Sequence, residues 1–451
     1  MARLDTNIDV KKEYAAKMRT PEQAAAVVKS GDWVDFGHGS IHAELCDKAL
    51  SERTEELFDI KLRALWIIDH CYCVEADPEG EHFAYSSFYF SAYERKLFDR
   101  GLCFHQPMQF RDVNKYYSEC IHTDVLFVAA TPMDEEGWFN MSLAGGVGRT
   151  FTENADFVVV EVNEHLPWVS DERKCSVHIS EVDMVVEGKH DALPELASKP
   201  ASENDKKIAG YIMPYIKDGA AIQIGIGGVP DALASIIADS DVKDLGMHTE
   251  FCTNGYMDLY KAGKITNRKK NIDKGIGLYA TSAGTHEFHR WIDRNPEVGV
   301  RPVGYMNDPY VIGQLDDFIS INGCLSVDLY GQVSSESVGL RQISGSGGQV
   351  DYALGALRSK GGRGFICLDS TRTSRDGTVH SNIVPHFNGE IVTTPRTHTM
   401  FIVTEHGAVN LLGKSSWERA EMLISVADPA FREDLIKAAE EQHVWRRSNK
   451  R

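Results

Sequence analysis

The chain has 451 residues, of which 42% are hydrophobic and 25% charged, and this composition is typical of a globular protein of two to three domains. Its net charge of −18 argues against nucleic acid as a partner, because binding to phosphates favours a basic surface. The first twenty residues lack the apolar core of a signal peptide, no run is long enough for a membrane helix, and the nine scattered cysteines are typical of reduced thiols. We therefore expect a cytoplasmic protein with no membrane partner.

Short apolar runs alternate with amphipathic runs along the chain. Helices are expected at 21–30, 230–240 and 417–427. Strands are expected at 125–130, 155–162, 220–225, 318–323, 364–369 and 399–405. Because nearly continuous Val, Ile and Phe runs suit strands that are covered on both faces, the sequence predicts an α/β fold with open, mainly parallel sheets.

Two pairs of segments recur in the same order in both halves of the chain. "KSGDWVDFGHGS" (29–40) matches "KDGAAIQIGIGG" (217–228) without a gap, and 123–140 resembles 315–333 with one gap. This repeat predicts two similar α/β domains, at 1–190 and 208–451, joined by a polar, proline-containing linker at 191–207. The alternative is a chance similarity between generic strand–helix units.

Several known motifs are absent from the sequence. "GIGGVP" and "GSGGQV" lack the third glycine of the dinucleotide fingerprint, 407–415 has the wrong spacing for a phosphate loop, and no G-x-S-x-G occurs. His248, Glu250 and Cys252 alternate along one predicted strand and could bind a metal, but the P-C-x-x-C of the zinc deaminases does not follow. We predict no metal and no resident cofactor.

A glycine-rich turn connects the strand at 220–225 to the helix at 230–240. Pro230 suits the first helical turn, and the backbone amides of Gly225 to Val229 are expected to face any ligand above the strand. Glycines allow close approach, and the amino end of a helix favours an anion or a developing oxyanion. The alternative is an ordinary tight turn.

Glu250 ends the strand that follows this helix, in "DLGMHTE". In a strand–helix–strand unit the two strands are parallel and end at the same edge of the sheet, where ligands bind. Glu250 should therefore lie within reach of the glycine turn. A carboxylate beside amide donors can act as a nucleophile towards an acyl carbon, although many acids at strand ends are solvated or cap helices.

A second glycine loop, "QISGSGGQVDYALGA" (342–356), also precedes an amphipathic run, with possible amide donors at Gly345, Gly347 and Gly348. Asn322 ends a predicted strand and could reach the same edge of the sheet. The basic clusters at 267–270 and 358–364 either meet phosphates or form solvated loops.

Motifs spread over essentially the whole chain resemble the acetyl-CoA hydrolase/transferase family of CoA-transferases. They include "IQIGIGGVPDALA", "GMHTE", "FISINGCLSVDLYGQVSSESVG" and "QISGSGGQVDYALGA", and in the first half "VVVEVNEHLP" and "VHISEVD". The resemblance implies two similar open-sheet domains and a glutamate that carries the reaction, at Glu250. It places the CoA-binding loop on Gly225, Ile226, Gly227, Gly228 and Val229, with further CoA contacts at Asn322 and Gly345. Glu336 in "SSESVG" is a competing acid that we rank second, because it lies beyond the strand that follows the glycine turn.

The resemblance implies transfer of CoA from a short-chain acyl-CoA, with butyryl-CoA expected, to acetate by a ping-pong mechanism through a glutamyl-CoA thioester. Exchange of one thioester for another is nearly neutral in energy, so neither ATP nor a metal is needed. The alternatives are another acyl group such as propionyl or 4-hydroxybutyryl, an acyl-CoA hydrolase that uses the same glutamate, and a sensor that binds without turnover. A homo-oligomer is compatible with the sequence.

Overall fold

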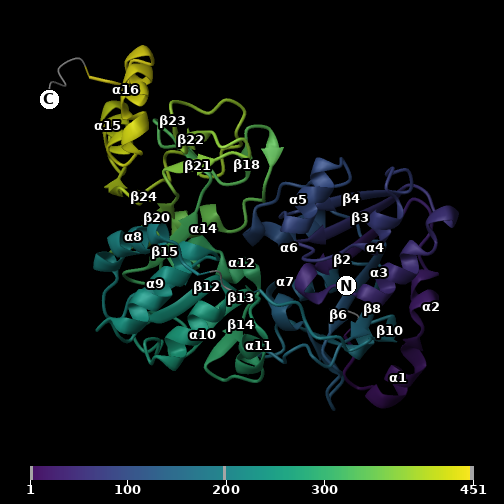
Figure 1. Cartoon of the computed structure of the whole chain (residues 1–451). Helices are drawn as coiled ribbons and strands as arrows, with labels where there is room; N and C mark the ends of the chain where they lie inside the picture. The colour runs from purple at the N-terminus through teal and green to yellow at the C-terminus, as the bar shows by residue number, and fades with distance from the viewer. Residues whose placement is uncertain (1–3, 197–199, 447–451) are drawn as a thin grey trace. The chain divides into compact units, whose positions relative to one another are not determined.

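The computed structural model describes residues 4–196 and 200–446, which form two compact units (Figure 1). Unit 1 consists of Met1–Ala197 and Leu278–Met306, and unit 2 of Ser198–Gly277 and Asn307–Arg451. The first boundary falls inside the segment 191–207, of which residues 197–199 lie outside the described residues. The end of that segment is not a linker, because helix α8 begins at Glu203.

Unit 1 is built on an eight-stranded sheet in which every neighbouring pair of strands is parallel. The strands, in spatial order, are β1 (Met18–Arg19), β10 (Met184–Glu187), β8 (Phe157–Val162), β6 (Val125–Ala130), β2 (Trp33–His38), β3 (Ile60–Leu65), β4 (Phe83–Ser87) and β5 (Phe104–His105). A separate antiparallel pair consists of β7 (Trp138–Asn140) and β9 (Ser176–His178).

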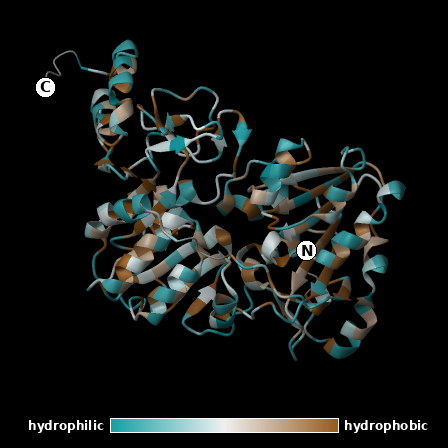
Figure 2. Ribbon diagram, viewed as in Figure 1, coloured by the Kyte–Doolittle hydropathy of each residue, from teal (hydrophilic) through white to brown (hydrophobic). Residues whose placement is uncertain are grey.

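The helices of unit 1 are α1 (Val10–Lys17), α2 (Pro21–Ala25), α3 (Glu44–Ser51), α4 (Tyr72–Ala76), α5 (Ala92–Asp99), α6 (Val113–Glu119) and α7 (Gly145–Glu153). All of them except α1 contribute buried residues. The returning segment contains most of β13 (Gly277–Ser282), then α11 (His286–Ile292), β14 (Val298–Val300) and α12 (Val303–Met306). Buried residues of β2, β3, α2, α3 and α4 belong to one hydrophobic cluster, and Figure 2 shows apolar residues along the strands.

Unit 2 contains a sheet of similar design. Its strands, in spatial order, are β12 (Gly246–Cys252), β11 (Ala221–Ile224), β15 (Ile319–Gly323), β20 (Arg363–Cys367), β24 (Phe401–Thr404) and β25 (Gly407–Asn410). The first five are parallel, and β25 pairs antiparallel with β24. Smaller sheets are formed by β16 (Ser326–Asp328) with β17 (Val333–Ser334) and β23 (Ile383–Val384), by β18 (Ser337–Val338) with β19 (Arg341–Gln342), and by β21 (Thr371–Thr373) with β22 (Val379–Ser381).

Two layers of helices and a C-terminal pair complete unit 2. The helices are α8 (Glu203–Ile212), α9 (Gly228–Asp239), α10 (Asn254–Lys261), α13 (Pro309–Ile312), α14 (Gln349–Arg358), α15 (Ser416–Ser425) and α16 (Arg432–Glu441). Tyr256 of α10 reaches β11, where its hydroxyl accepts a hydrogen bond from the amide of Ile224. Tyr352 of α14 belongs to another cluster, with Phe318 and Ala221.

The repeat predicted from the sequence corresponds to a shared topology. Five strands of unit 1 correspond one to one with five strands of unit 2, in their order along the chain and in their order across the sheet. They are β2, β3, β6, β8 and β10 in unit 1 and β11, β12, β15, β20 and β24 in unit 2. The predicted α/β class with large, mainly parallel sheets in two domains is therefore confirmed.

Predicted elements and observed elements differ mainly at their ends. The strand expected at 125–130 coincides with β6, and the helix expected at 230–240 is α9, which begins two residues earlier. The helix expected at 21–30 ends at Ala25, because Val27 and Val28 donate to the carbonyls three residues earlier and tighten the chain into turns. No helix in the described ranges has the length and apolar character needed to cross a membrane.

Candidate active site

The first glycine turn follows β11, as expected, and the amide of its first residue is used in the sheet. Gly227 has a φ of +124°, which suits glycine, and Ile226 is half exposed at the top of the turn. Gly228 starts α9, and a Cβ atom there would lie 2.6 Å from Cγ of Asp205 on α8. The Gly225 amide, by contrast, donates to the Ile321 carbonyl of β15 at 3.2 Å. The expectation of an outward amide is thus wrong for Gly225, because sheet pairing uses it.

The register of the sheet places Glu250 beside the end of this turn. Ala221 of β11 pairs with Gly246 of β12, and Gln223 pairs with Ser320 of β15. Because side chains alternate along a strand, Glu250 near the end of β12 lies on the same face as Gln223. Asn322, two residues after Ser320, shares that face. Glu250 and Asn322 therefore come from the two strands that flank β11, both at the carboxyl ends.

Three groups from later parts of the chain surround the Glu250 carboxylate. Nδ2 of Asn307 donates a hydrogen bond to Oε2 of Glu250. Gly348, the residue before α14, lies so close that a Cβ atom would overlap both Oε2 of Glu250 and Nδ2 of Asn307. Asp351 follows in the first turn of α14. Among the described residues, Oε2 is the one carboxylate oxygen of Glu250 with a hydrogen bond, and Oε1 has none.

The same surroundings change the acidity of Glu250. Burial raises the pKa of its carboxyl from 4.5 to about 7, the hydrogen bond from Asn307 opposes this, and the negative charge of Asp351 adds to it. A partly desolvated carboxylate with an oxygen available for attack is a more reactive nucleophile than a fully solvated one. Such a shift is common at functional sites.

Asn322 belongs to a polar network in the middle of the sheet. Its Nδ2 donates to Oγ of Ser320 at 2.9 Å and to Oε1 of Gln223 at 3.3 Å. Ser320 donates to the same Gln223 oxygen at 2.8 Å. Gln223 and Ser320 are buried, whereas Asn322 is partly exposed. The network fixes the orientation of the Asn322 side chain at the edge of the sheet.

The second glycine loop reaches the site through Gly348 rather than through Gly345. Gly345 is buried, and its carbonyl accepts a hydrogen bond from the Ser344 hydroxyl, which also donates to the carbonyl of Ser335 at 2.8 Å. Gly347 has a φ of +51°, which turns the chain into Gly348 and α14. The loop precedes helix α14, and Gly348 is its member in contact with the Glu250 carboxylate, whereas the CoA contact predicted at Gly345 stays a prediction.

Glu336, the competing acid, lies next to β18 in one of the small sheets. It is buried, and its carbonyl accepts hydrogen bonds from Ile343 at 2.7 Å and Ser344 at 3.2 Å. Burial raises the pKa of its carboxyl, and a hydrogen bond with Thr393 lowers it. Among the described residues, the hydrogen-bond partners of Glu336 are Ile343, Ser344 and Thr393, and none of them belongs to the site around Glu250.

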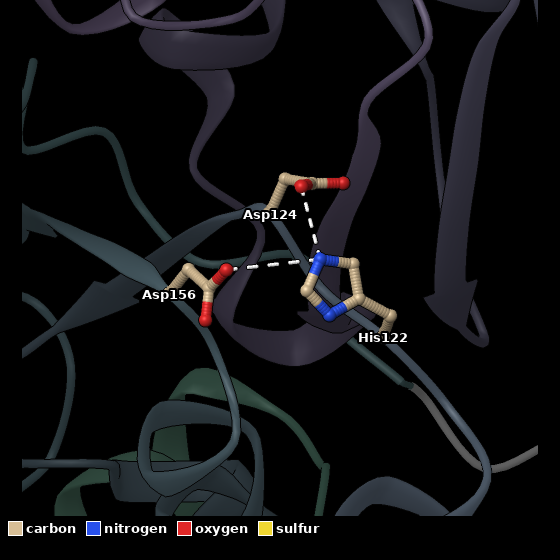
Figure 3. Close-up of side chains that lie close together, drawn as sticks. All are labelled: His122, Asp124 and Asp156. Carbon is tan, nitrogen blue, oxygen red and sulfur yellow. Dashed lines mark hydrogen bonds and ion pairs between the residues drawn. The ribbon is translucent and has the colours of Figure 1, made fainter.

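The metal site considered for His248, Glu250 and Cys252 is not formed by the described residues, because the ligand atoms of these three side chains do not lie close together. His248 packs its ring edge-on against Phe318, with ring centroids 6.2 Å apart. Within the described ranges, one group of three such residues has ligand atoms within 4.8 Å of one another, and it consists of His122, Asp124 and Asp156 (Figure 3). It lies before β6 and β8, at the opposite strand ends from Glu161, and His122 and Asp156 are exposed.

The basic clusters lie away from the edge that carries Glu250. Lys270 is buried, and its Nζ donates to the carbonyls of Met247 and Ile276 at 3.2 and 2.9 Å, while Asn267 accepts from the Met247 amide at 2.8 Å. These two residues of the 267–270 cluster are therefore structural, contrary to the prediction of a phosphate site or a solvated loop. The 358–364 cluster joins α14 to the start of β20, again at the amino ends of the strands.

Comparison with known proteins identifies the family. The N-terminal domain model of the acetyl-CoA hydrolase/transferase family matches residues 1–194, and the C-terminal domain model matches residues 284–439. The chain belongs to the acetyl-CoA hydrolase/transferase family. The resemblance stated from the motifs is thus confirmed.

Individual relatives cover nearly the whole chain. The butyryl-CoA:acetate CoA-transferase of Anaerostipes caccae is 44% identical over 443 residues, which are 98% of this chain and 99% of that protein. The 4-hydroxybutyrate coenzyme A transferase of Clostridium kluyveri is 33% identical over 94% of this chain and 97% of its own length. The crystal structure of RipA from Yersinia pestis superimposes with a TM-score of 0.87 at 33% identity, over 97% of this chain and all of RipA. The prediction of a CoA-transferase enzyme is confirmed by these relatives.

Asn307 and Asp351 belong to this site although the sequence does not predict it. Asn307 precedes "DP", which is a common helix start, so its sequence context indicates a turn. Asp351 resembles an ordinary acidic residue in the first turn of a helix. No local pattern marks either residue, because their proximity to Glu250 results from packing between distant segments.

Proposed function

We propose that this protein transfers CoA from a short-chain acyl-CoA, butyryl-CoA first among the candidates, to acetate, and that Glu250 carries the CoA between them. The observation that supports the proposal most directly is the state of Glu250. Its carboxyl is partly buried, has a raised pKa, accepts one hydrogen bond through Oε2, has no partner for Oε1 among the described residues, and lies near the end of a strand beside a glycine turn. The identity of the acyl group and the acceptor follows the relative from Anaerostipes caccae.

The first half-reaction forms two bonds and breaks two. Oε1 of Glu250 attacks the thioester carbonyl, the C–S bond breaks, and an acyl-glutamyl anhydride and CoA thiolate result. The thiolate then attacks Cδ of Glu250, the anhydride C–O bond breaks, and butyrate leaves with the oxygen that was Oε1. The enzyme now holds a glutamyl-CoA thioester, and Oε2 is its carbonyl oxygen.

The second half-reaction reverses these steps with acetate. A carboxylate oxygen of acetate attacks Cδ and displaces the thiolate, and the thiolate attacks the acetyl carbon of the new anhydride. Acetyl-CoA leaves, and one acetate oxygen stays on Glu250. No proton is transferred and no oxidant or nucleotide is consumed. Retention of CoA in the site makes each thiolate attack effectively intramolecular, which can lower a barrier by about 7–11 kcal/mol.

The carboxyl ends of β11, β12 and β15 supply the surroundings that this chemistry needs. Ile226, Gly227, Gly228 and Val229 present a turn at the start of α9, which is a favourable place for an oxyanion or a phosphate. Asn322, oriented by Gln223 and Ser320, is placed to donate or accept a hydrogen bond at the same edge. We assign these residues, together with Gly225 and Gly345 as shape-determining glycines, to CoA binding.

Intact mass spectrometry tests the proposal. The protein is incubated with butyryl-CoA in the absence of an acceptor, and we expect a covalent adduct of the mass of CoA minus water, located on the peptide that contains Glu250. Glu250→Gln should form none. If wild-type protein forms no adduct, or if the adduct lies on the peptide of Glu336, the assignment is wrong.

A second assay separates transfer from hydrolysis. Free thiol is measured after addition of butyryl-CoA with and without acetate, and acetyl-CoA is measured in parallel. A transferase produces acetyl-CoA only with acetate and releases little free thiol. Release of free CoA at the same rate without acetate would identify a hydrolase. Competition among propionyl-CoA, butyryl-CoA and 4-hydroxybutyryl-CoA then ranks the acyl groups by kcat/KM.

A further inference from the structure

The pairing between β11 and β12 stops before the carboxyl ends of these strands. The last pair between them is Ile222 with Met247. Both strands continue beyond this pair, β11 as far as Ile224 and β12 as far as Cys252. On its other side, β11 stays paired with β15 up to Ile224. The two strands are therefore unpaired at the edge of the sheet where the candidate site lies.

The register shows which residues would meet if the pairing continued. One further step of the ladder would set Ile224 opposite Thr249. The next residue pair would then be Gly225, the first residue of the glycine turn, and Glu250. Paired strands lie about 4.8 Å apart, and a group between two backbones needs about 3.5–4.0 Å on each side. A fully paired edge would therefore leave no space for a substrate group between the turn and Glu250.

The hydroxyl of Tyr256 lies where this pairing is interrupted. It accepts a hydrogen bond from the Ile224 amide at 2.8 Å and forms another with the Thr249 side chain. Because the Gly225 amide donates to β15 and successive amides of a strand point to opposite sides, the Ile224 amide points towards β12. The hydroxyl thus takes a hydrogen bond that β12 would otherwise accept. It does so between the two residues that directly precede Gly225 and Glu250.

Packing of α10 keeps the Tyr256 hydroxyl in this place. Tyr256 is 1% exposed, and α10 lies beside α9, the helix that follows the glycine turn (Figure 1). A Cβ atom on Gly255 would be 3.3 Å from Cβ of Ala234 on α9, so the two helices approach closely. Burial raises the pKa of the Tyr256 hydroxyl, which therefore keeps its proton. A protonated hydroxyl can both donate and accept, which allows it to bond to both strands.

We propose that Tyr256 is a positioning residue: its hydroxyl spreads the carboxyl ends of β11 and β12, and the thioester group of the acyl-CoA enters the space kept between Gly225 and Glu250. This inference rests on the proposed function, and it assigns a role to a residue that acts through two strands. Oε1 of Glu250 must reach the thioester carbonyl while the glycine turn lies on the other side of that group. The separation of the two strand ends therefore sets the geometry of attack.

Tyr256→Phe removes the hydroxyl and keeps the ring. The Ile224 amide then loses its acceptor and can return to β12, which brings Gly225 and Glu250 closer together. The rate of adduct formation at saturating butyryl-CoA is measured by quenched mass spectrometry, and the affinity for free CoA by titration calorimetry. We expect the rate to fall about 10²-fold, because a displacement of reacting groups by roughly 1 Å can have this effect. The affinity for CoA should be unchanged, because the hydroxyl orients the reacting groups without binding CoA.

Tyr260→Phe is the matched control on the same helix. Tyr260 lies one turn after Tyr256, and its hydroxyl accepts a hydrogen bond from Nδ2 of Asn267 at 2.7 Å. This variant also loses a tyrosine hydroxyl with a hydrogen bond, but away from the interrupted pairing. It should lower the thermal unfolding temperature while forming the adduct at the wild-type rate. All rates are expressed per folded protein, as determined by thermal unfolding.

Thr249→Val provides a second variant if Tyr256→Phe does not fold. It removes the hydrogen bond between the Tyr256 hydroxyl and β12, and it should also slow adduct formation without weakening CoA binding. Adduct formation by Tyr256→Phe or by a folded Thr249→Val protein at the wild-type rate would overturn the inference and leave the proposed function intact. A loss of CoA affinity in proportion to the rate, or an equal loss of rate in Tyr260→Phe, would also overturn it. A wild-type protein that forms no adduct would overturn both.

Discussion

Two carboxylates at strand ends, the buried Glu161 of unit 1 and the partly buried Glu250 of unit 2, differ in their hydrogen-bond partners. Glu161 lies one residue before the end of β8, and its two oxygens accept hydrogen bonds from the amides of Leu45 and Cys46 at 3.2 and 3.1 Å. These amides open α3, whose own N-cap residue supplies no side-chain bond. Within the described part of the chain, Glu250 accepts one hydrogen bond, from the Asn307 side chain, and its other oxygen has no partner.

The comparison separates a structural acid from a reactive one. Burial raises the pKa of both carboxyls, so acidity alone does not distinguish them. A carboxylate whose two oxygens both accept hydrogen bonds from backbone amides at the start of a helix caps that helix. A carboxylate in which one oxygen accepts a hydrogen bond and the other accepts none is oriented, and its second oxygen can still attack an acyl carbon. The number of donors to the carboxylate is therefore a property that points to chemistry.

The largest expected effect comes from exchanging each acid for its amide. Glu250→Gln should abolish the CoA adduct and reduce transferase activity by at least about 10³-fold, because the nucleophilic oxygen is lost. Glu161→Gln should form the adduct at nearly the wild-type rate. Adduct mass and acetyl-CoA production measure both. Equal losses in the two variants would remove the distinction between the two carboxylates.

Two glycines, Gly348 directly before α14 and Gly355 within it, test how closely Oε2 of Glu250 must be held. Gly348→Ala places a methyl group where the carboxylate lies and should slow adduct formation by about 10²-fold, because small displacements of a reacting group are costly. Gly355→Ala places the methyl group against Ile312 and should cost stability instead. Single-turnover rates and thermal unfolding distinguish the two effects. A Gly348→Ala protein with normal rates would contradict the close contact.

The smallest expected effect is on stability, and its sign differs between the two acids. Folding raises the pKa of Glu250 from 4.5 to about 7, so the folded protein binds this proton more tightly than the unfolded chain does. The resulting stabilisation is complete below pH 4.5 and is lost as the pH rises through about 7. The glutamine of Glu250→Gln still has an oxygen that can accept the hydrogen bond from Asn307, and it carries no negative charge. It should therefore be more stable than wild type at pH 8, by about 1–3 kcal/mol.

Glu161→Gln should be less stable than wild type at the same pH, by about 1–2 kcal/mol. Glutamine offers one acceptor to two backbone amides, so a donor at the start of α3 is left without a partner. Free energies of unfolding from urea titrations at pH 5 and pH 8 measure both changes. A stabilised Glu161→Gln protein would show that capping of α3 is not the role of this carboxylate.

The sequence predicted those features that depend on local patterns. The strand at 125–130 was predicted at its observed bounds, because both of its faces are buried and its residues are uniformly apolar. The placement of Glu250 beside a glycine turn followed from the strand–helix–strand order. What could not be predicted depends on contacts between distant segments: Asn307 is 57 residues from Glu250, and the Gly225 amide is used by β15. Lys270 resembled a surface charge, yet it is buried beneath β12.

The two-part composition of unit 1 has a consequence for how the protein is made. Residues 278–306 return to it with specific bonds: the Trp168 amide donates to Asp293 at 2.7 Å, and the Val300 amide to the Ser170 carbonyl at 2.8 Å. During synthesis on the ribosome, folding of unit 1 cannot be completed until residues 278–306 are translated, and these residues follow the strand that carries Glu250. A shortened gene that stops at residue 197 would omit that segment and leave the loop around Trp168 without these partners.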